Sequence, residues 1–545
     1  MFNMVRKEAI FCVLQNLALK KNDKGVFKMA KNLQMKFYSN RSPKKGYSWE
    51  TMPAPIPEDK IAETLSTEVL VIGGGISGLA ASARCADRGL KVMVLDKNTK
   101  LVALAGQVAA VNSRIMAEKG IVIDKKKLAA DWLKVSGSRV QEDLLWLFIN
   151  RSAEGFHWML DLAGEENLNV GVYVAYKGPV FEEYPGTHHV FKKKECTKYT
   201  NFGGGMLVCE ILEKAMLERG GLLYRGVTAK QLLKDETGRV IGCVAQDGDG
   251  VYRKYLGTKA VVVATGDCCD DNEMLEAFCP IGTRPAEKFP RKGNTGDGQK
   301  MLYWAGAALD NPEWAPTLHA LAYSGFQGFY LHVNQLGKRF MNEDTWMQAK
   351  SVRCLMQPGG DYCFSVMDAK YLDEMGERWN EIGGQGMAPL SVEGEGYNRE
   401  RFEKQIQRAL DQGNAFKADT LEELAEKMDV PVDELLKTVK RYNEIVASGD
   451  DTDFGKRTSL LTSVEKAPFI ALKWGPRLLD VFGGAQVNTD LQVLDMDGHV
   501  IPGLYAVGNT AGGMYAVDYP LLLNGNSYGR ALAYAMQIAD GLCRE

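Results

Sequence analysis

The 545-residue chain lacks the features that mark several classes of protein. No hydrophobic run reaches the roughly 20 residues that a membrane-spanning helix needs. The formal net charge of −3 leaves no excess of positive charge for nucleic acid or an anionic membrane surface. The eleven cysteines contain no C-x-x-C pair, no haem-attachment motif and no zinc-ligand spacing. We therefore expect a cytoplasmic protein with reduced thiols, no metal, no nucleic-acid partner and no membrane span.

The composition that is present is typical of a soluble globular protein. Hydrophobic residues make up 45% and charged residues 25%, and the length suggests two or three domains. The 57 glycines gather partly in short clusters, which indicates loops where the backbone approaches a ligand. A short apolar run at Ala9–Leu19 and a Pro-rich polar stretch precede the first strong element. Residues 1–66 are therefore interpreted as a leader and an extended lead-in.

That first strong element is a β-α-β unit. Residues 68–72 (EVLVI) form a nearly continuous apolar strand, of the kind that is buried in a parallel sheet. The turn GGGISG leads into a helix of small residues at 79–87, and a second apolar strand follows at 91–95. This order predicts a Rossmann-type α/β domain.

The turn between strand and helix has the spacing of a dinucleotide-binding site. Gly73 allows the tight turn, Gly75 lets the backbone approach a pyrophosphate, and Gly78 lets the helix pack on the strand. The first helical N–H groups, at Ile76 and Ser77, offer a positive dipole end to the phosphates. Asp96, at the end of the second strand, is placed to accept hydrogen bonds from ribose hydroxyls.

The rest of the chain alternates between two patterns. A buried strand at 260–264 belongs with the first domain, but residues 400–447 are strongly helical and carry regular apolar faces. After Lys456 the strand pattern returns, and the chain ends in a helix from about Leu521 to Leu542. We therefore predict a discontinuous α/β domain formed by residues 67–312 and 456–545, with a mixed insertion at 313–455.

Several segments, taken together, resemble a known family. They are EVLVIGGGISGLAAS, GNTGDGQKMLYWAGA at 293–307, VNQLGKRFMNE at 333–343 and GGAQVNTDLQVLDMDGHVIPGLYAVGN at 483–509. Residues 67–545 resemble the FAD-dependent flavoproteins of the fumarate reductase and succinate dehydrogenase family, which includes soluble ene-reductases and 3-ketosteroid dehydrogenases. The resemblance implies a Rossmann-type FAD-binding domain with an inserted α+β capping domain over the flavin.

The resemblance also implies a set of cofactor contacts. No segment is readable as a flavin attachment site, so we expect FAD to be held non-covalently. The residues expected to bind it are Gly73, Gly75, Ile76, Ser77, Gly78, Asp96, Lys97, Gly106, Gln107, Val227, Ala264, Thr265, Gly266, Gly508, Asn509, Leu522 and Leu523.

Four departures from the family bear on the substrate. Two histidine positions of the family's motifs are here Ala315 and Tyr515, and its two arginine positions are Met347 and Tyr519. An arginine–carboxylate clamp is among the strongest recognition elements in proteins, and both of its arginines are absent. Fumarate and succinate are therefore not the expected substrates.

The leading hypothesis is an FAD-dependent oxidoreductase that transfers hydride between flavin N5 and a carbonyl-activated C=C or CH–CH bond. Its substrate would be a small, neutral, planar or polycyclic molecule. Tyr519 is the first candidate for the proton donor and Tyr515 the second, because a phenol can donate to a carbonyl. The alternatives are a 3-ketosteroid dehydrogenase-like enzyme and a non-catalytic electron-transfer flavoprotein. No donor module is recognisable, so a separate electron donor or acceptor is expected.

Overall fold

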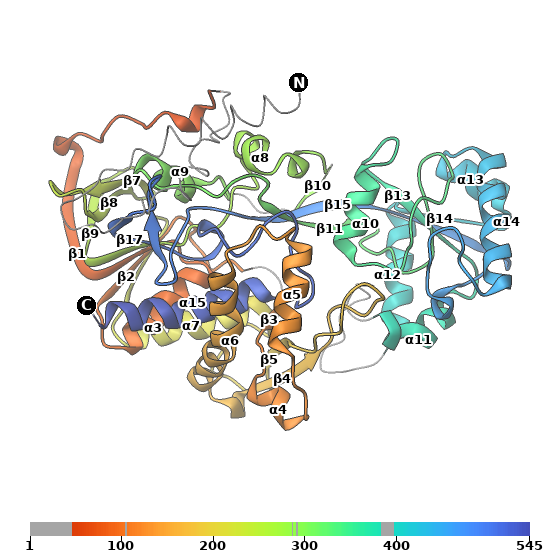
Figure 1. The fold of residues 1–545 in the computed structure, drawn as a ribbon, viewed down its shortest axis with the longest axis horizontal. Helices are drawn as coiled ribbons and strands as arrows, with labels where there is room; N and C mark the ends of the chain where they lie inside the picture. Colours follow the sequence, from red (N-terminus) through yellow and green to blue (C-terminus); the bar gives the residue numbers. More distant parts are fainter. Residues whose placement is uncertain (1–45, 104–105, 286, 290–292, 383–396, 545) are drawn as a thin grey trace, which may run out of the picture.

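The computed structural model describes residues 46–103, 106–285, 287–289, 293–382 and 397–544. The apolar run at Ala9–Leu19 lies outside the described residues. The larger half of the molecule is built on an eight-stranded sheet. Figure 1 shows this half beside a smaller cap that carries α11 to α14. Among the described residues, no helix is both long and apolar enough to cross a bilayer.

The eight-stranded sheet forms the core of the larger half. Its main path is β16-β17-β9-β1-β2-β6, with β7 and β8 joined at one side. The bounds are β1 Ile61–Ile72, β2 Val92–Asp96, β6 Leu222–Arg225, β7 Thr228–Lys234, β8 Val240–Gln246, β9 Tyr252–Val263, β16 Gln492–Leu494 and β17 Val500–Ala506. Strands from both ends of the chain therefore share one sheet, since β17 pairs in parallel with β9.

The predicted β-α-β unit is present with shifted boundaries. β1 starts at Ile61, seven residues before the predicted strand, and its first residues are half-buried or exposed. Only its last four residues, Val69–Ile72, form the buried run that the sequence pattern revealed. The helix α3, Ile76–Asp87, begins three residues before the predicted start, directly after Gly75. The exposed first half of this 12-residue strand carries little hydrophobic signal, which accounts for the first shift.

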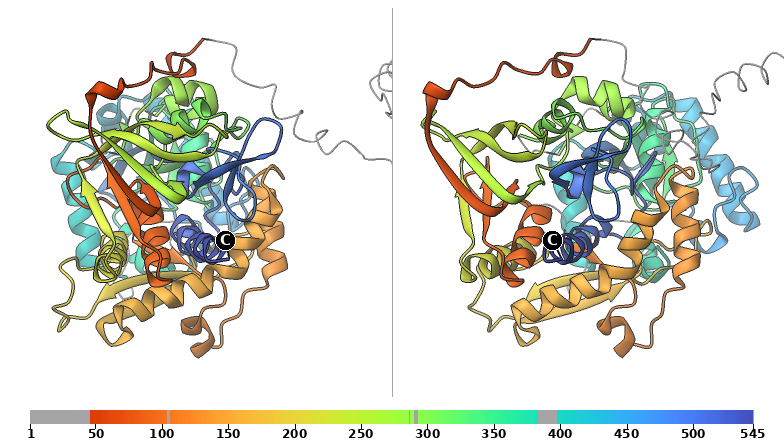
Figure 2. Two further views of the ribbon diagram at one scale, coloured as in Figure 1. Left: turned by 90° about the vertical axis from the view of Figure 1, so that its left-hand side faces the viewer. Right: turned by 60° about the vertical axis from the view of Figure 1, so that its left-hand side comes forward.

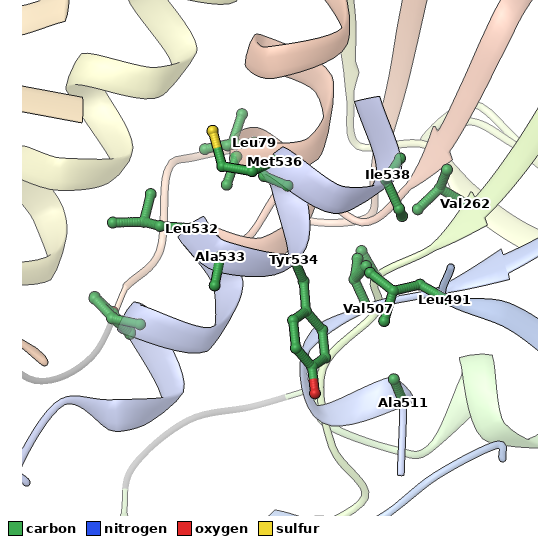
Figure 3. Packing of buried hydrophobic residues seen from close by; sticks show 14 of the residues in the cluster. Leu79, Val262, Leu491, Val507, Ala511, Leu532, Ala533, Tyr534, Met536 and Ile538 are labelled. Atoms are coloured by element: carbon green, nitrogen blue, oxygen red, sulfur yellow. The ribbon is translucent and has the colours of Figure 1, made fainter. Parts of the chain in front are cut away.

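Helices cover the sheet and meet around the last helix of the chain. The bounds are α4 Arg114–Glu118, α5 Lys125–Val135, α6 Glu142–Ala163, α7 Gly204–Glu218, α8 Asn272–Phe278, α9 Asp297–Trp304 and α15 Asn526–Leu542. α15 packs against both α3 and α6, and Figure 2 shows it near the centre of the larger half. Figure 3 shows Tyr534, Met536 and Ile538 of this helix among Leu79, Val262, Leu491 and Val507.

A three-stranded sheet stands beside α15. Its order is β3-β5-β4, with β3 Gln107–Ala109, β4 Leu168–Tyr173 and β5 Thr187–Lys192. The backbone N–H of Ala109 donates to the carbonyl of Gly525, which fixes β3 against the turn that precedes α15.

The cap is organised around one long strand, β15 (Phe469–Phe482). The sheet order is β10-β15-β13-β12, and β11 and β14 also pair with β15. The other strands are β10 Glu287–Lys288, β11 Ala315–Tyr323, β12 Leu331–Val333, β13 Cys363–Met367 and β14 Ala415–Ala418. The cap helices are α10 Met347–Leu355, α11 Tyr371–Ile382, α12 Arg399–Asp411, α13 Leu421–Met428 and α14 Val432–Ser448. Figure 1 shows β15 running from the cap toward the larger half.

Candidate active site

A cavity lies at the carboxyl ends of β1, β2 and β9, beside the first turn of α3. It encloses about 1180 Å³ of empty space, including its open mouth. This is the edge where parallel α/β sheets bind their ligands. The predicted cofactor residues that line it are Gly73, Gly75, Ile76, Ser77, Asp96, Lys97, Val227, Ala264, Thr265, Gly266, Gly508 and Asn509.

The three motif glycines meet different requirements in the structure. A Cβ at Gly73, where φ is +114°, would lie 2.3 Å from the Ala264 carbonyl oxygen, so the turn tolerates no side chain. A Cβ at Gly78 would lie 1.9 Å from the Gly73 carbonyl oxygen, which makes this glycine a packing residue between helix and strand. A Cβ at Gly75 would meet no protein atom within 4 Å and would enter the cavity. The protein alone therefore does not require glycine at 75, whereas a closely approaching ligand would.

The end of the cavity at β2 is charged. Asp96 accepts from the guanidinium of Arg225 at 2.9 Å and from the backbone N–H of Asn98 at 3.1 Å. Burial raises the pKa of Asp96 although both partners lower it. Lys97 donates to Asp297 at 2.8 Å and to the Gly293 carbonyl oxygen. The segment GNTGDG is thereby held against the end of β2.

Further cavity-lining residues were not named from the sequence. They include Asn98, Thr228, Asp267, Asn294, Asp297, Met301, Asp480, Ser527 and Tyr528. Asn294 and Asp297 belong to the family motif at 293–307, which could have identified them. Asp480 and Ser527 come from β15 and α15, and they reach the cavity only because the fold brings these distant segments to it.

Five predicted cofactor residues do not line this cavity: Gly78, Gly106, Gln107, Leu522 and Leu523. Gln107 and the turn at 521–525 are neighbours, because a Cβ at Gly525 would lie 2.2 Å from the Gln107 carbonyl oxygen. Their contact with a cofactor remains a prediction.

The two candidate tyrosines lie in a stack of three aromatic rings. The Phe482 ring is 4.7 Å from the rings of Tyr515 and Tyr519, and the two tyrosine rings are 5.6 Å apart at an interplanar angle of 19°. Between the tyrosines, Val517 has a φ of +66°, which a β-branched residue rarely adopts. This strained turn places Tyr515 and Tyr519 on the same side of the segment.

The hydroxyl groups of these tyrosines have different partners. Tyr515 donates its hydroxyl proton to the side-chain oxygen of Asn526 in a hydrogen bond of 2.7 Å. The Tyr519 oxygen accepts from the backbone N–H of Ser527 at 3.3 Å, and Ser527 lines the cavity. Burial raises the pKa of Tyr519 to about 12 and that of Tyr515 well above its ordinary value, so both keep their protons at neutral pH.

A buried arginine lies behind the stack. The guanidinium of Arg530 donates to the side-chain oxygen of Asn509 at 2.9 Å and lies 4.6 Å from the centre of the Tyr515 ring. Its Nε and Nη1 atoms have no hydrogen-bond partner among the described residues. Because an unpaired buried donor is costly, these atoms indicate room for a ligand beside Asn509.

Two of the positions predicted to correspond to the family's cationic groups are apolar. Ala315 and Met347 are both buried, at the starts of β11 and α10. The next residue, Gln348, bonds to the backbone of Pro316 and Leu318 and to the carboxylate of Asp518. A hydrogen-bonded cluster of Gln348 and Asp518 therefore lies next to the aromatic stack. Among the described residues, no group of three or more His, Cys, Asp or Glu side chains is placed to hold a metal ion.

This fold and this cavity are those of a flavoprotein oxidoreductase. The family model described as FAD binding domain matches residues 68–526, and the chain belongs to that family. The chain is 24% identical over 490 residues to the vinyl phenol reductase of Lactiplantibacillus plantarum, covering 86% of this chain and 95% of the relative. It is 26% identical over 548 residues to a probable fumarate reductase of Shewanella frigidimarina, covering 93% and 83%.

The fold is shared with a solved 3-ketosteroid delta1-dehydrogenase from Sterolibacterium denitrificans. The TM-score is 0.67 at 19% sequence identity, over 88% of this chain and 99% of that one. The predicted family resemblance, the α/β fold class and the class of enzyme, an FAD-dependent oxidoreductase, are therefore confirmed.

Proposed function

We propose that this protein binds FAD non-covalently and acts as an ene-reductase or dehydrogenase on neutral, planar alkenes activated by a conjugated group. Bound FAD would supply hydride chemistry at its N5 atom. The residues at Gly73–Ser77, Asp96 and Gly508–Asn509 would hold its nucleotide and ring. The observation that carries the proposal is the Tyr519 hydroxyl, which touches the backbone of a residue that lines the cavity.

Tyr519 is the proposed proton donor. Its oxygen accepts from the backbone N–H of Ser527 and also bonds to the Ser527 side chain, at the wall of the cavity. A phenol in that position can donate its proton to a substrate. Tyr515 cannot offer its proton without breaking the bond to Asn526. We therefore assign proton transfer to Tyr519 and ring positioning to Tyr515 and Phe482.

The preference for a neutral substrate rests on charge. A dicarboxylate would need cations, and the family's cationic positions are Ala315, Met347, Tyr515 and Tyr519. The nearest buried cation, Arg530, lies behind the ring of Tyr515. Similarity to a vinyl phenol reductase supports an aromatic alkene in place of a dicarboxylate.

The electron source is proposed to be a separate partner or a diffusible carrier. Whether the reaction runs as reduction or oxidation in the cell does not alter the roles assigned to the residues. A 3-ketosteroid would be accepted by the same chemistry, so steroids belong in the substrate panel.

The test begins with the purified holoprotein, reduced anaerobically with dithionite in stoichiometric amount. Benzalacetone (4-phenyl-3-buten-2-one), 1,4-androstadiene-3,17-dione and fumarate are then mixed with it separately, and flavin reoxidation is followed by its absorbance. We expect reoxidation by an uncharged enone and none by fumarate. If no uncharged alkene reoxidises the flavin while a redox dye does, the protein is an electron-transfer subunit and the proposal is wrong.

A further inference from the structure

Two strands that enter the region of the aromatic stack carry polar side chains that this catalytic scheme does not use. β11 and β15 are antiparallel neighbours, with Ala315 opposite Phe482 and His319 opposite Arg477. Leu318 packs in a separate apolar cluster with Leu478, whereas Ala315 belongs to the cluster that contains Phe482, Tyr515 and Tyr519.

Side chains alternate between the two faces of a strand, and this alternation shows which face of β11 carries Thr317 and His319. Thr317 and His319 flank Leu318 and so point to the opposite side of β11, which is the side of Ala315 and the aromatic stack. A register shift between Pro316 and Leu318 bends the strand locally, without moving Leu318 out of its cluster. Both polar side chains therefore lie on the face of the strand that belongs to the active region.

Each of these side chains has a buried polar atom without a hydrogen-bond partner among the described residues. The two atoms are Thr317 Oγ1 and His319 Nε2. A buried hydrogen-bonding atom is normally paired, and two unpaired ones close together on one strand face call for an explanation. A ligand that supplies the missing partners is the simplest one.

Asp480 connects this pair to the cavity. It lines the cavity from β15, and its charge acts on both His319 and Tyr519. Burial lowers the pKa of His319 to about 4, although the charge of Asp480 opposes the shift, so the imidazole is uncharged at neutral pH. A neutral imidazole beside a carboxylate would repel a carboxylate on a substrate and would accept a hydroxyl group.

We propose that Thr317, His319 and Asp480 form a subsite that binds a hydroxyl group on the substrate, so that the preferred substrates are uncharged hydroxylated alkenes such as phenols. This rests on the proposed function, because the subsite would orient the same substrate whose double bond meets Tyr519. It adds a specificity element that the two tyrosines do not provide, namely an acceptor for the substrate's own hydroxyl proton.

The experiment compares two enones that differ by a single hydroxyl group, benzalacetone and 4-hydroxybenzalacetone. The reduced holoenzyme is mixed with each, and the rate and saturation of flavin reoxidation are measured. We expect kcat/KM to favour the hydroxylated enone by at least about tenfold, the effect of one hydrogen bond to a buried group, and mainly through KM. 4-Hydroxycinnamate, which adds a carboxylate, should be the poorer substrate.

The variant His319→Leu should reduce that preference to about threefold or less by weakening only the hydroxylated substrate. Asp480→Asn should reduce the preference as well, and its rate with benzalacetone is compared separately, because Asp480 also lines the cavity and acts on Tyr519. His319→Gln keeps a hydrogen-bonding group and should restore part of the preference, which a purely structural role for the histidine would not predict. His332→Leu is the matched control, because His332 is another buried histidine with an unpaired Nε2 atom but belongs to β12, where it pairs with Ser365 of β13.

The FAD content and the thermal midpoint of every variant are measured alongside the kinetics, so that loss of fold or cofactor is recognised. A wild-type preference near one, or a preference that both His319→Leu and Asp480→Asn retain, would overturn the subsite while the proposed function stands. If neither enone reoxidises the flavin, the proposed function itself has failed.

Discussion

Replacing Tyr519 by phenylalanine removes one hydroxyl group and leaves the three-ring stack in place. The ring contacts with Phe482 at 4.7 Å and Tyr515 at 5.6 Å do not involve the oxygen. That oxygen bonds only weakly to Ser527, whose backbone N–H donates at 3.3 Å and whose side chain also contacts it. Loss of these bonds beside the cavity should cost about 0.5–1.5 kcal/mol of stability. Loss of an acid at the reacting centre should slow the chemical step by roughly 10²–10⁴-fold.

Tyr515→Phe should produce the opposite pattern. Its hydroxyl donates at 2.7 Å to Asn526, whose amide group in turn donates to the carbonyl oxygens of Pro520 and Leu523. Removing the hydroxyl leaves the buried Asn526 oxygen unpaired, which should cost about 1–3 kcal/mol. The rate of the chemical step should change by less than about tenfold, since this proton is not the one transferred.

The assay pairs single-turnover reoxidation of the reduced flavin by an accepted enone with a thermal unfolding curve for each variant. We expect Tyr519→Phe to reoxidise its flavin slowly and to keep its stability. We expect Tyr515→Phe to reoxidise its flavin at close to the wild-type rate and to be less stable. A Tyr519→Phe protein that reacts at the wild-type rate would show that tyrosine is not the acid. If Tyr515→Phe reacts slowly and keeps its stability, Tyr515 is the proton donor and Tyr519 positions the ring.

Three further predictions concern the cofactor, the substrate and pH. Gly75→Trp should fold but purify without yellow colour, because its side chain would occupy the cavity, whereas Gly89→Ala, at a surface turn, should keep FAD. Fumarate should not reoxidise the reduced flavin, and rapid reoxidation would mean that cations reach the site from residues other than 315, 347, 515 and 519. Burial raises the pKa of Asp518 from 3.8 to about 7. The wild type should therefore lose stability as the pH rises toward 7, because the unfolded carboxyl ionises in that range while the folded one keeps its proton. The free energy of unfolding of Asp518→Asn, relative to that of the wild type, should rise by on the order of 2–3 kcal/mol between pH 5 and pH 8, as measured by urea unfolding.

The nucleotide end of the site could be predicted because its signal is local. The strand, turn and helix from Val69 to Asp87 are contiguous, and the steric needs of Gly73 and Gly78 arise from backbone atoms of that turn and of Ala264. A glycine spacing therefore encodes the geometry directly. Asp480 gave no such signal, because it joins the cavity only through the long strand β15 and the pairing of that strand with β11.

The polar residues near the substrate end were harder to recognise for a related reason. Nothing adjacent to His319 in the sequence suggests a partner for its side chain. Its Nε2 atom is buried without a hydrogen-bond partner among the described residues, and this can be recognised only in the three-dimensional structure. Arg530 was missed in the same way, because an arginine inside an apolar helical pattern is usually at its solvent edge, and here it is fully buried.

The position of α15 has a consequence for the synthesis of the protein. This helix is the last element of the chain, yet it fills the space between α3 and α6 and covers apolar residues of the central sheet. A ribosome-bound chain that has completed the cap still exposes Leu79, Val262 and their neighbours until residues 526–542 emerge. We therefore expect a chain that is truncated within residues 526–542, by even two helical turns, to aggregate.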